Sequence, residues 1–197
     1  MKEFVAIDFE TANGKRASAC SVGMAAFDAN GQVSATYYQL LRPHPSVDYF
    51  QARNTGIHGI TAADVAGSPY WSDIRPAVLD FIGDRVLVAH NMAFDGSVLN
   101  SLALAYGHEN LINPRMCTLK IARAKLCELP KHRLNLVFDH YFPGEKLDHH
   151  LASADAEACG RIFARMQTDY AYEDLEVCGT QSPTPGSRAR QEPRYFF

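Results

Sequence analysis

The segment that most limits the fold is an apolar run near the start of the chain, at residues 4–9. Its residues are mostly apolar on both faces of an extended strand, which is typical of a strand buried in the middle of a sheet. Further strand-like stretches follow at 21–27 and 33–41, and Ala29-Asn30-Gly31 supplies the turn between them. Three strands joined by short connections predict an antiparallel meander.

The pattern changes after the third strand. Residues 43–69 contain several prolines and are expected to be irregular, with a turn at His58-Gly59-Ile60-Thr61. Beyond them we expect a helix capped by Ser68 or Ser72, a strand at 86–89, a strand or turn entering a helix at 116–124, and helices at 93–105, 134–140 and 151–166. This order predicts an α/β fold with a mixed sheet. We expect one domain over 1–178 and a Pro/Gly/Ser-rich tail over 179–197.

Composition excludes several classes of protein. The formal net charge is −3, so the overall charge does not indicate a nucleic-acid binder. The five cysteines are odd in number and none forms a C-x-x-C pair, which argues against a zinc site or a disulfide framework. The first residues show no signal peptide, and no apolar run has the length of a membrane span. We therefore expect a cytoplasmic protein without a membrane partner.

Two acids end the first strand. Asp8 and Glu10 are two residues apart, so their side chains project to the same face. In α/β sheets ligands bind beyond the carboxyl ends of such strands. Two carboxylates there require a compensating cation, either a divalent metal such as Mg²⁺ or Mn²⁺ or a neighbouring lysine or arginine.

Further acids open two later helices. Asp95 follows Asn91, the expected cap of the 93–105 helix, and Asp155 opens the last long helix after His149 and His150. Each has a simpler interpretation: an acid favoured by the helix dipole, a surface aspartate, or an exposed loop histidine. Small residues next to Asp155 indicate that another backbone approaches this helix closely.

The motifs in combination resemble the DnaQ-like 3′–5′ exonucleases of the DEDDh type, such as the exonuclease domain of DNA polymerase III epsilon subunits. The resemblance rests on three segments, Asp8-Phe9-Glu10, Asn91-Met92-Ala93-Phe94-Asp95 and His150-Leu151-Ala152-Ser153-Ala154-Asp155. Many relatives read Asp-x-Glu-Thr-Thr-Gly, whereas this chain continues Thr11-Ala12-Asn13. The difference concerns the loop that holds the terminal nucleotide and leaves the acids intact.

This resemblance implies a ribonuclease-H-like sandwich with a mixed five-stranded sheet flanked by helices. It implies that Asp8, Glu10, Asp95 and Asp155 hold two divalent ions, Mg²⁺ or Mn²⁺. His150 is the expected general base, because the family places the base five residues before the last aspartate. His149 then remains a loop or supporting residue.

The implied reaction removes nucleoside 5′-monophosphates from the 3′ end of single-stranded or frayed DNA, as in proofreading. RNA or oligoribonucleotide trimming is an alternative within the same class. A non-catalytic subunit bound to a polymerase is an alternative of another class, although an inactive relative would be expected to lack an acid or the histidine. A DNA polymerase or another replication or repair protein is an expected partner.

Two sets of residues are expected to contact nucleic acid. The expected nucleotide contacts are Phe9, Thr11, His58, Asn91 and Phe94, with core packing as the alternative for both phenylalanines. Residues 115–133 carry six cations and one acid, and they either line the backbone path or form a solvated surface.

Overall fold

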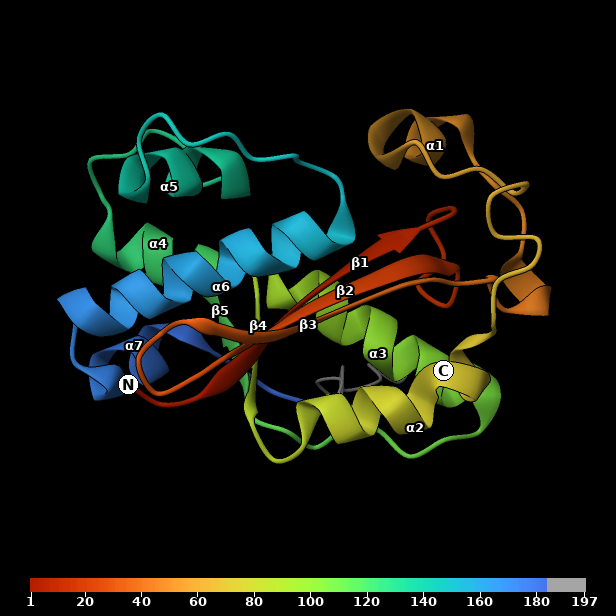
Figure 1. The fold of residues 1–197 in the computed structure, drawn as a ribbon, viewed down its shortest axis with the longest axis horizontal. Coiled ribbons are helices and arrows are strands. Elements are labelled where there is room, and N and C mark those ends of the chain that lie inside the picture. The colour runs from red at the N-terminus through yellow and green to blue at the C-terminus, as the bar shows by residue number, and fades with distance from the viewer. Residues whose placement is uncertain (184–197) are drawn as a thin grey trace, which may run out of the picture.

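A computed structural model describes residues 1–183, so most of the expected tail lies outside the described residues. A single mixed sheet forms the centre, in the strand order β3-β2-β1-β4-β5-β6 (Figure 1). The strands are β1 (Phe4–Thr11), β2 (Ala19–Phe27), β3 (Val33–Leu40), β4 (Val86–Ala89), β5 (Arg115–Cys117) and β6 (Thr180–Gln181). β1, β2 and β3 pair antiparallel, whereas β4 pairs parallel with β1 and with β5.

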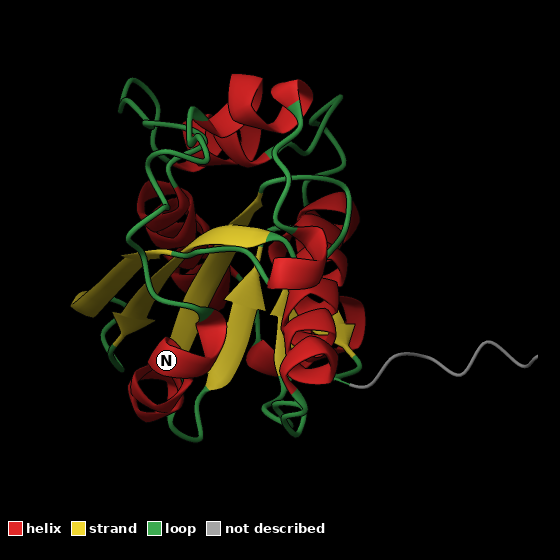
Figure 2. Ribbon diagram, turned by 90° about the vertical axis from the view of Figure 1, so that its right-hand side faces the viewer, coloured by secondary structure: helices red, strands yellow, loops and turns green. Residues whose placement is uncertain are grey.

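Helices cover both faces of the sheet. They are α1 (Ala52–His58), α2 (Trp71–Ile82), α3 (Met92–Tyr106), α4 (Thr118–Lys125), α5 (Leu134–Tyr141), α6 (Ala152–Asp169) and α7 (Tyr172–Gly179). α2 and α3 lie on one face, and α4 to α7 lie on the other, with α6 crossing the sheet (Figure 1). Figure 2 shows the twisted strands between these helical layers. None of the helices within 1–183 is long and apolar enough to cross a membrane.

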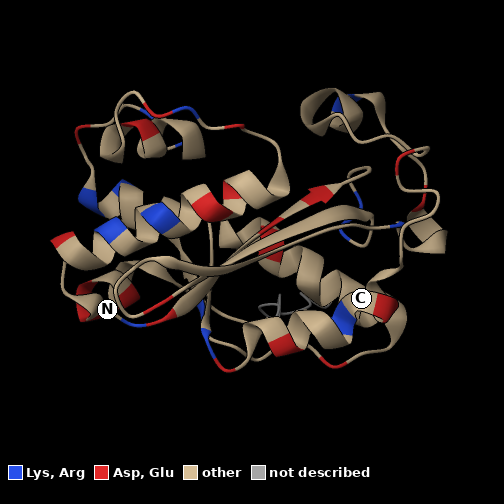
Figure 3. Cartoon of the chain, viewed as in Figure 1, with Lys and Arg blue, Asp and Glu red and all other residues tan. Residues whose placement is uncertain are grey.

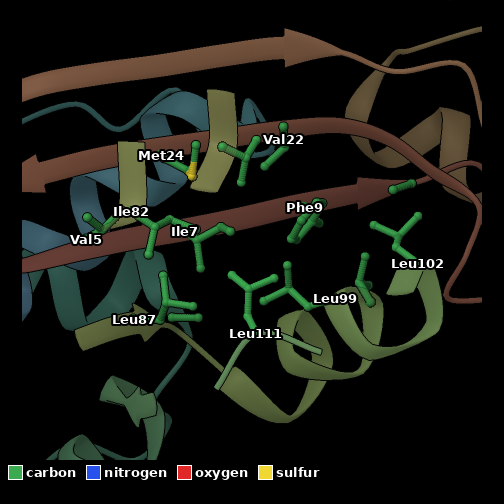
Figure 4. Packing of buried hydrophobic residues seen from close by; sticks show 14 of the residues in the cluster. Val5, Ile7, Phe9, Val22, Met24, Ile82, Leu87, Leu99, Leu102 and Leu111 are labelled. Carbon is green, nitrogen blue, oxygen red and sulfur yellow. The ribbon is translucent and has the colours of Figure 1, made fainter. Parts of the chain in front are cut away.

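The alternation of β1 divides the core into two clusters. Val5, Ile7 and Phe9 pack with residues of α2 and α3 (Figure 4). Phe4 and Ala6 pack in the cluster that includes α6. Because side chains alternate along a strand, Asp8 and Glu10 continue the α6 face. The apolar burial of β1 on both faces therefore fixes the direction in which its two acids project.

The expected meander and the mixed α/β sheet flanked by helices are confirmed, with one strand more than the five expected. The additional strand, β6, pairs with β5. It has only two residues and is therefore too short for a sequence period to reveal it. It lies within the expected tail, so residues 179–181 belong to α7 and β6.

Two short helices and one cap also differ from expectation. α1 forms inside the region expected to be irregular; it has seven residues, none of them buried, and ends at Gly59 in the left-handed conformation. α7 was not expected either, and only Leu175 and Gly179 are buried in it. α2 is capped at Tyr70 rather than at a serine. The side chain of Asp73 accepts a hydrogen bond from the backbone N–H of Tyr70.

Candidate active site

The two acids of β1 are held close to other carboxylates at the carboxyl end of the strand. Burial raises the pKa of Asp8 well above its usual value, and the charges of Asp95, Asp155 and Glu10 raise it further. Burial and the charge of Asp155 also raise the pKa of Glu10, to about 7. These shifts show that the site disfavours the accumulation of negative charge unless a cation is bound.

Asp95 reaches the same place from the first turn of α3. Its side chain is 1% exposed, and its Oδ1 accepts the backbone N–H of Phe9 at 3.1 Å. Burial raises its pKa to about 8. Asn91 occupies the expected N-cap position of this helix, but its backbone is left-handed (φ 85°) and its side chain makes no capping hydrogen bond. Its carbonyl instead accepts the N–H of Phe94 at 2.7 Å.

Asp155 is brought in by a close approach between α6 and β2. Gly23 on β2 is the register partner of Asp8. A Cβ atom at Gly23 would lie 2.2 Å from the backbone carbonyl carbon of Ala152, the first residue of α6. The absence of a side chain at this one position lets the start of the helix lie against the sheet. Asp155, one turn further along, is consequently 3% exposed and lies beside Asp8.

The two histidines before α6 contact Asp155 in different ways. The ring Nδ1 of His149 lies 2.9 Å from both carboxylate oxygens of Asp155. That hydrogen bond raises the pKa of His149, whereas burial lowers the pKa of His150. His150 has a left-handed backbone (φ 76°), and its backbone N–H donates to Asp155 Oδ2 at 3.0 Å.

The donor set fits a divalent metal. Ligand oxygens of Asp8, Glu10 and Asp155 all lie within 4.8 Å of one another, and a second group joins Asp155 to both histidines. Within residues 1–183 no lysine or arginine forms an ion pair with these acids or with Asp95. Carboxylates that cluster without a lysine or arginine ion pair are the ligands that hard divalent cations prefer.

The expected nucleotide contacts are divided between the site and the core. Thr11 and His58 come together: His58 Nε2 donates to the Thr11 carbonyl at 3.3 Å, and its Nδ1 accepts the Ile60 N–H at 3.0 Å. Phe9 is 2% exposed and packs against Trp71 at a ring separation of 5.8 Å, which is the core alternative. Phe94 remains half-buried.

Arg16 was missed as a site residue. Its guanidinium carbon lies 4.2 Å from the centre of the Phe94 ring, and its charge lowers the pKa of Asp95. The loop that carries it is fixed by Asn13, whose side chain donates to the carbonyls of Val47 and Tyr49. The available signal was the cationic pair Lys15-Arg16 in the loop that departs from the family pattern.

One cation of the 115–133 stretch is not on the surface. Arg115 is 1% exposed, and its guanidinium donates to the carbonyls of Gly96 and Leu111 and to the side chain of Asn100. It therefore ties β5 to α3, the helix that carries Asp95, and is excluded from a surface path for nucleic acid.

The fold and the acidic site together define a ribonuclease-H-like nuclease domain, and the chain is an enzyme of that class. A family model described as an exonuclease, RNase_T, matches residues 5–163. The chain therefore belongs to the RNase_T exonuclease family.

Several relatives support this membership. The chain is 34% identical over 176 residues to the PolC-type DNA polymerase III of Halalkalibacterium halodurans, covering 88% of this chain and 12% of that protein. It is 28% identical over 163 residues to the DNA polymerase III epsilon subunit of Aquifex aeolicus, covering 83% of this chain and 79% of that subunit. This chain thus spans only about an eighth of the PolC-type relative.

A solved structure has the same fold. The nuclease domain of 3′hExo, a DEDDh family member bound to rAMP, superimposes with a TM-score of 0.69 at 16% sequence identity, over 92% of this chain and 97% of that domain. At this identity the likeness establishes the fold.

Proposed function

We propose that the chain hydrolyses phosphodiester bonds from the 3′ end of single-stranded or frayed DNA and releases nucleoside 5′-monophosphates. The convergence of Asp8, Glu10 and Asp155, with ligand oxygens within 4.8 Å of one another, carries this proposal. Asp95 completes the set from α3. An enzyme that removes successive nucleotides must bind features shared by all of them, chiefly the backbone phosphates.

The four carboxylates would hold two divalent cations, Mg²⁺ or Mn²⁺. When bound, such ions supply charge stabilisation at the phosphate oxygens and activation of the attacking water. Binding also changes the formal charge of the chain from −3 to about +1, so the site attracts a polyanion only in its loaded form. Asp8, at the centre of the cluster, would contact both ions.

His150 would accept the proton of the attacking water. Within residues 1–183 its ring forms no ion pair with an acid, whereas Nδ1 of His149 is already bonded to Asp155. His149 would then orient the Asp155 carboxylate. The terminal nucleotide would contact Thr11, His58, Asn91 and Phe94, and Arg16 would join them, whereas Phe9 would support the strand from the core.

Oligonucleotide digestion tests the proposal directly. The purified protein is incubated with Mg²⁺ or Mn²⁺ and with 5′-labelled single-stranded DNA, the same sequence as RNA, and a duplex with a 3′ mismatch. We expect a ladder that shortens from the 3′ end, loss of activity with a chelator, and faster removal of mismatched than paired ends. No metal-dependent products from any substrate would refute nuclease activity and favour the non-catalytic subunit.

RNA is the second candidate substrate. It is favoured by the rAMP-bound relative of the same fold, whereas the polymerase relatives favour DNA. The ratio of RNA to DNA rates in the same digestion decides between them. The polymerase relatives also support a DNA polymerase as partner and a cytoplasmic location, which co-purification with replication proteins would test.

A further inference from the structure

Three cations of the 115–133 stretch lie around one cavity. This cavity has a volume of about 440 Å³ and is lined by Arg123, Lys131 and Arg133, together with His90 and His132. Figure 3 shows the basic residues of α4 and of the segment leading to α5 in blue. No carboxylate is among the lining residues.

The other cations of the stretch already have partners. Lys120 donates to the Thr180 carbonyl at 3.3 Å, and Lys125 pairs with Asp174 at 3.6 Å. In contrast, Arg123, Lys131 and Arg133 are exposed, and within residues 1–183 they form neither ion pairs nor side-chain hydrogen bonds. Three such cations around one hollow repel one another, so an anion bound between them is stabilised.

The cavity has a fixed wall. His90 Nε2 donates to the His132 carbonyl at 2.8 Å, and His90 Nδ1 accepts the hydroxyl of Thr118 at 2.9 Å. The ring of His132 in turn bonds the Leu126 carbonyl at 2.9 Å. These bonds connect the loop after α4 to the end of β4, and Lys131 and Arg133 are the immediate neighbours of the anchored His132.

His90 also places the cavity next to the carboxylate cluster. It directly follows β4, the parallel neighbour of the strand that carries Asp8. The charges of Asp155 and His149 both act on the pKa of His90, which burial lowers to about 4. The ring is therefore neutral at pH 7, and the positive charge of the cavity comes from the arginines and the lysine.

We propose that this cavity binds a backbone phosphate of the substrate strand, on the 5′ side of the nucleotide that is removed. The identity of the ligand rests on the proposed nuclease function, because a strand whose 3′ end lies at the carboxylates extends only in the 5′ direction. The lining holds three cations, Arg123, Lys131 and Arg133, and no carboxylate, and this charge favours a phosphate as the ligand.

Binding is tested with a fluorescent 12-nucleotide oligothymidylate, followed by anisotropy over a range of salt concentrations. The test variant is Lys131→Ala/Arg133→Ala. The control variant, Lys120→Ala/Arg165→Ala, removes two other exposed cations. We expect the test variant to weaken binding about tenfold and to reduce the slope of log Kd against log salt by roughly 0.7 for each phosphate that the variant no longer binds. Equal Kd values and slopes for the two variants would overturn the proposal.

Two further measurements test whether the cavity binds a phosphate of the strand. The first tests the alternative that its residues act in the chemistry, and the second tests the alternative that it binds free phosphate. Thymidine 5′-p-nitrophenyl phosphate has no upstream phosphate, so the test variant and the wild type should hydrolyse it at the same rate. A loss of this rate in the test variant would assign these residues to the chemistry instead. Inorganic phosphate at millimolar concentration should not displace the oligonucleotide, and full displacement would indicate a site for free phosphate. If the wild type hydrolyses neither thymidine 5′-p-nitrophenyl phosphate nor the oligonucleotide, the nuclease proposal fails. The anisotropy comparison still decides whether the cavity binds the strand.

Discussion

His149 and Asp155 are joined side chain to side chain, with Nδ1 of the ring 2.9 Å from each carboxylate oxygen. The next residue, His150, reaches the same carboxylate only through its backbone N–H, at 3.0 Å. The two rings stack with centroids 3.8 Å apart. The two histidines therefore contact Asp155 through different atoms, His149 through its ring and His150 through its backbone N–H. The ring of His150 remains available to accept a proton.

Substitution of these histidines should therefore have unequal effects. His150→Ala should lower kcat by roughly 10²–10⁴-fold, the usual contribution of a general base, and leave metal affinity unchanged. His149→Ala should weaken metal affinity, because Asp155 loses its orienting partner. Single-turnover rates and calorimetric Mn²⁺ titrations measure the two effects. An inactive His149→Ala beside a normal His150→Ala would exchange their roles.

Gly23 should be essential for the site although it carries no functional group. Gly23→Ala forces a methyl group into the backbone of Ala152, so α6 must move away from β2 and withdraw Asp155 from Asp8. Overpacking of this kind costs about 1–3 kcal/mol of stability. We expect weaker metal binding and strongly reduced activity in protein that still folds. Gly67→Ala is the control, since a Cβ there meets nothing within 4 Å. Full activity of Gly23→Ala would show that α6 does not depend on this close approach.

The acidic cluster predicts that metal stabilises the protein more at high pH. The folded-state pKa of Glu10 is about 7 and that of Asp95 about 8, whereas unfolded carboxyls titrate near pH 4. Between these values the folded metal-free protein binds more protons than the unfolded chain, so its stability falls as pH rises. Bound cations oppose that loss.

Thermal unfolding checks this dependence. In a chelator, the contribution of these acids should lower Tm between pH 5.5 and 8.0, and added Mn²⁺ should raise Tm more at pH 8.0. Asp8→Asn/Asp95→Asn should reduce both the pH dependence and the metal effect. An equal gain in Tm at the two pH values would exclude the cluster as the metal site.

Phe9 should matter for stability rather than for binding. Its ring is buried against Trp71, and Phe→Ala substitutions in a core cost about 3–5 kcal/mol. Phe9→Leu keeps most of the apolar volume and should preserve the KM for oligonucleotides while lowering the free energy of unfolding. Denaturant titration and steady-state kinetics distinguish the two roles. A raised KM at unchanged stability would restore Phe9 as a base-stacking residue.

The sequence predicts those parts of the fold that depend on long, regular patterns. The apolar run of β1 and the alternation of Asp8 and Glu10 were sufficient to predict a central strand and a shared acidic face. The meander and the helix carrying Asp155 were equally predictable. These features follow from burial and from the periods of strands and helices.

The remaining features depend on tertiary contacts that have no local period. β6 is a two-residue strand that pairs with β5, and α1 buries none of its residues. The spacing of the family motif selected His150, but no sequence pattern shows that His149 contacts Asp155. Likewise, six cations in one stretch look equivalent in sequence, although Arg115 is buried and Lys125 is paired.

Substitution of Arg16 tests whether the loop that departs from the family pattern contributes to substrate binding. Its guanidinium lies over Phe94 and its charge acts on Asp95, whereas the exposed side chain of its neighbour Lys15 has no partner within residues 1–183. Arg16→Ala should raise the KM for oligonucleotides several-fold, because the half-buried Phe94 ring, a proposed contact of the terminal nucleotide, loses the cation that covers it. Lys15→Ala removes the same charge from the same loop and should have a smaller effect. The double variant Arg16→Ala/Phe94→Ala should be no worse than the more damaging single variant, since the two side chains act as one surface. Strictly additive losses in KM would show that Arg16 and Phe94 contact the substrate independently.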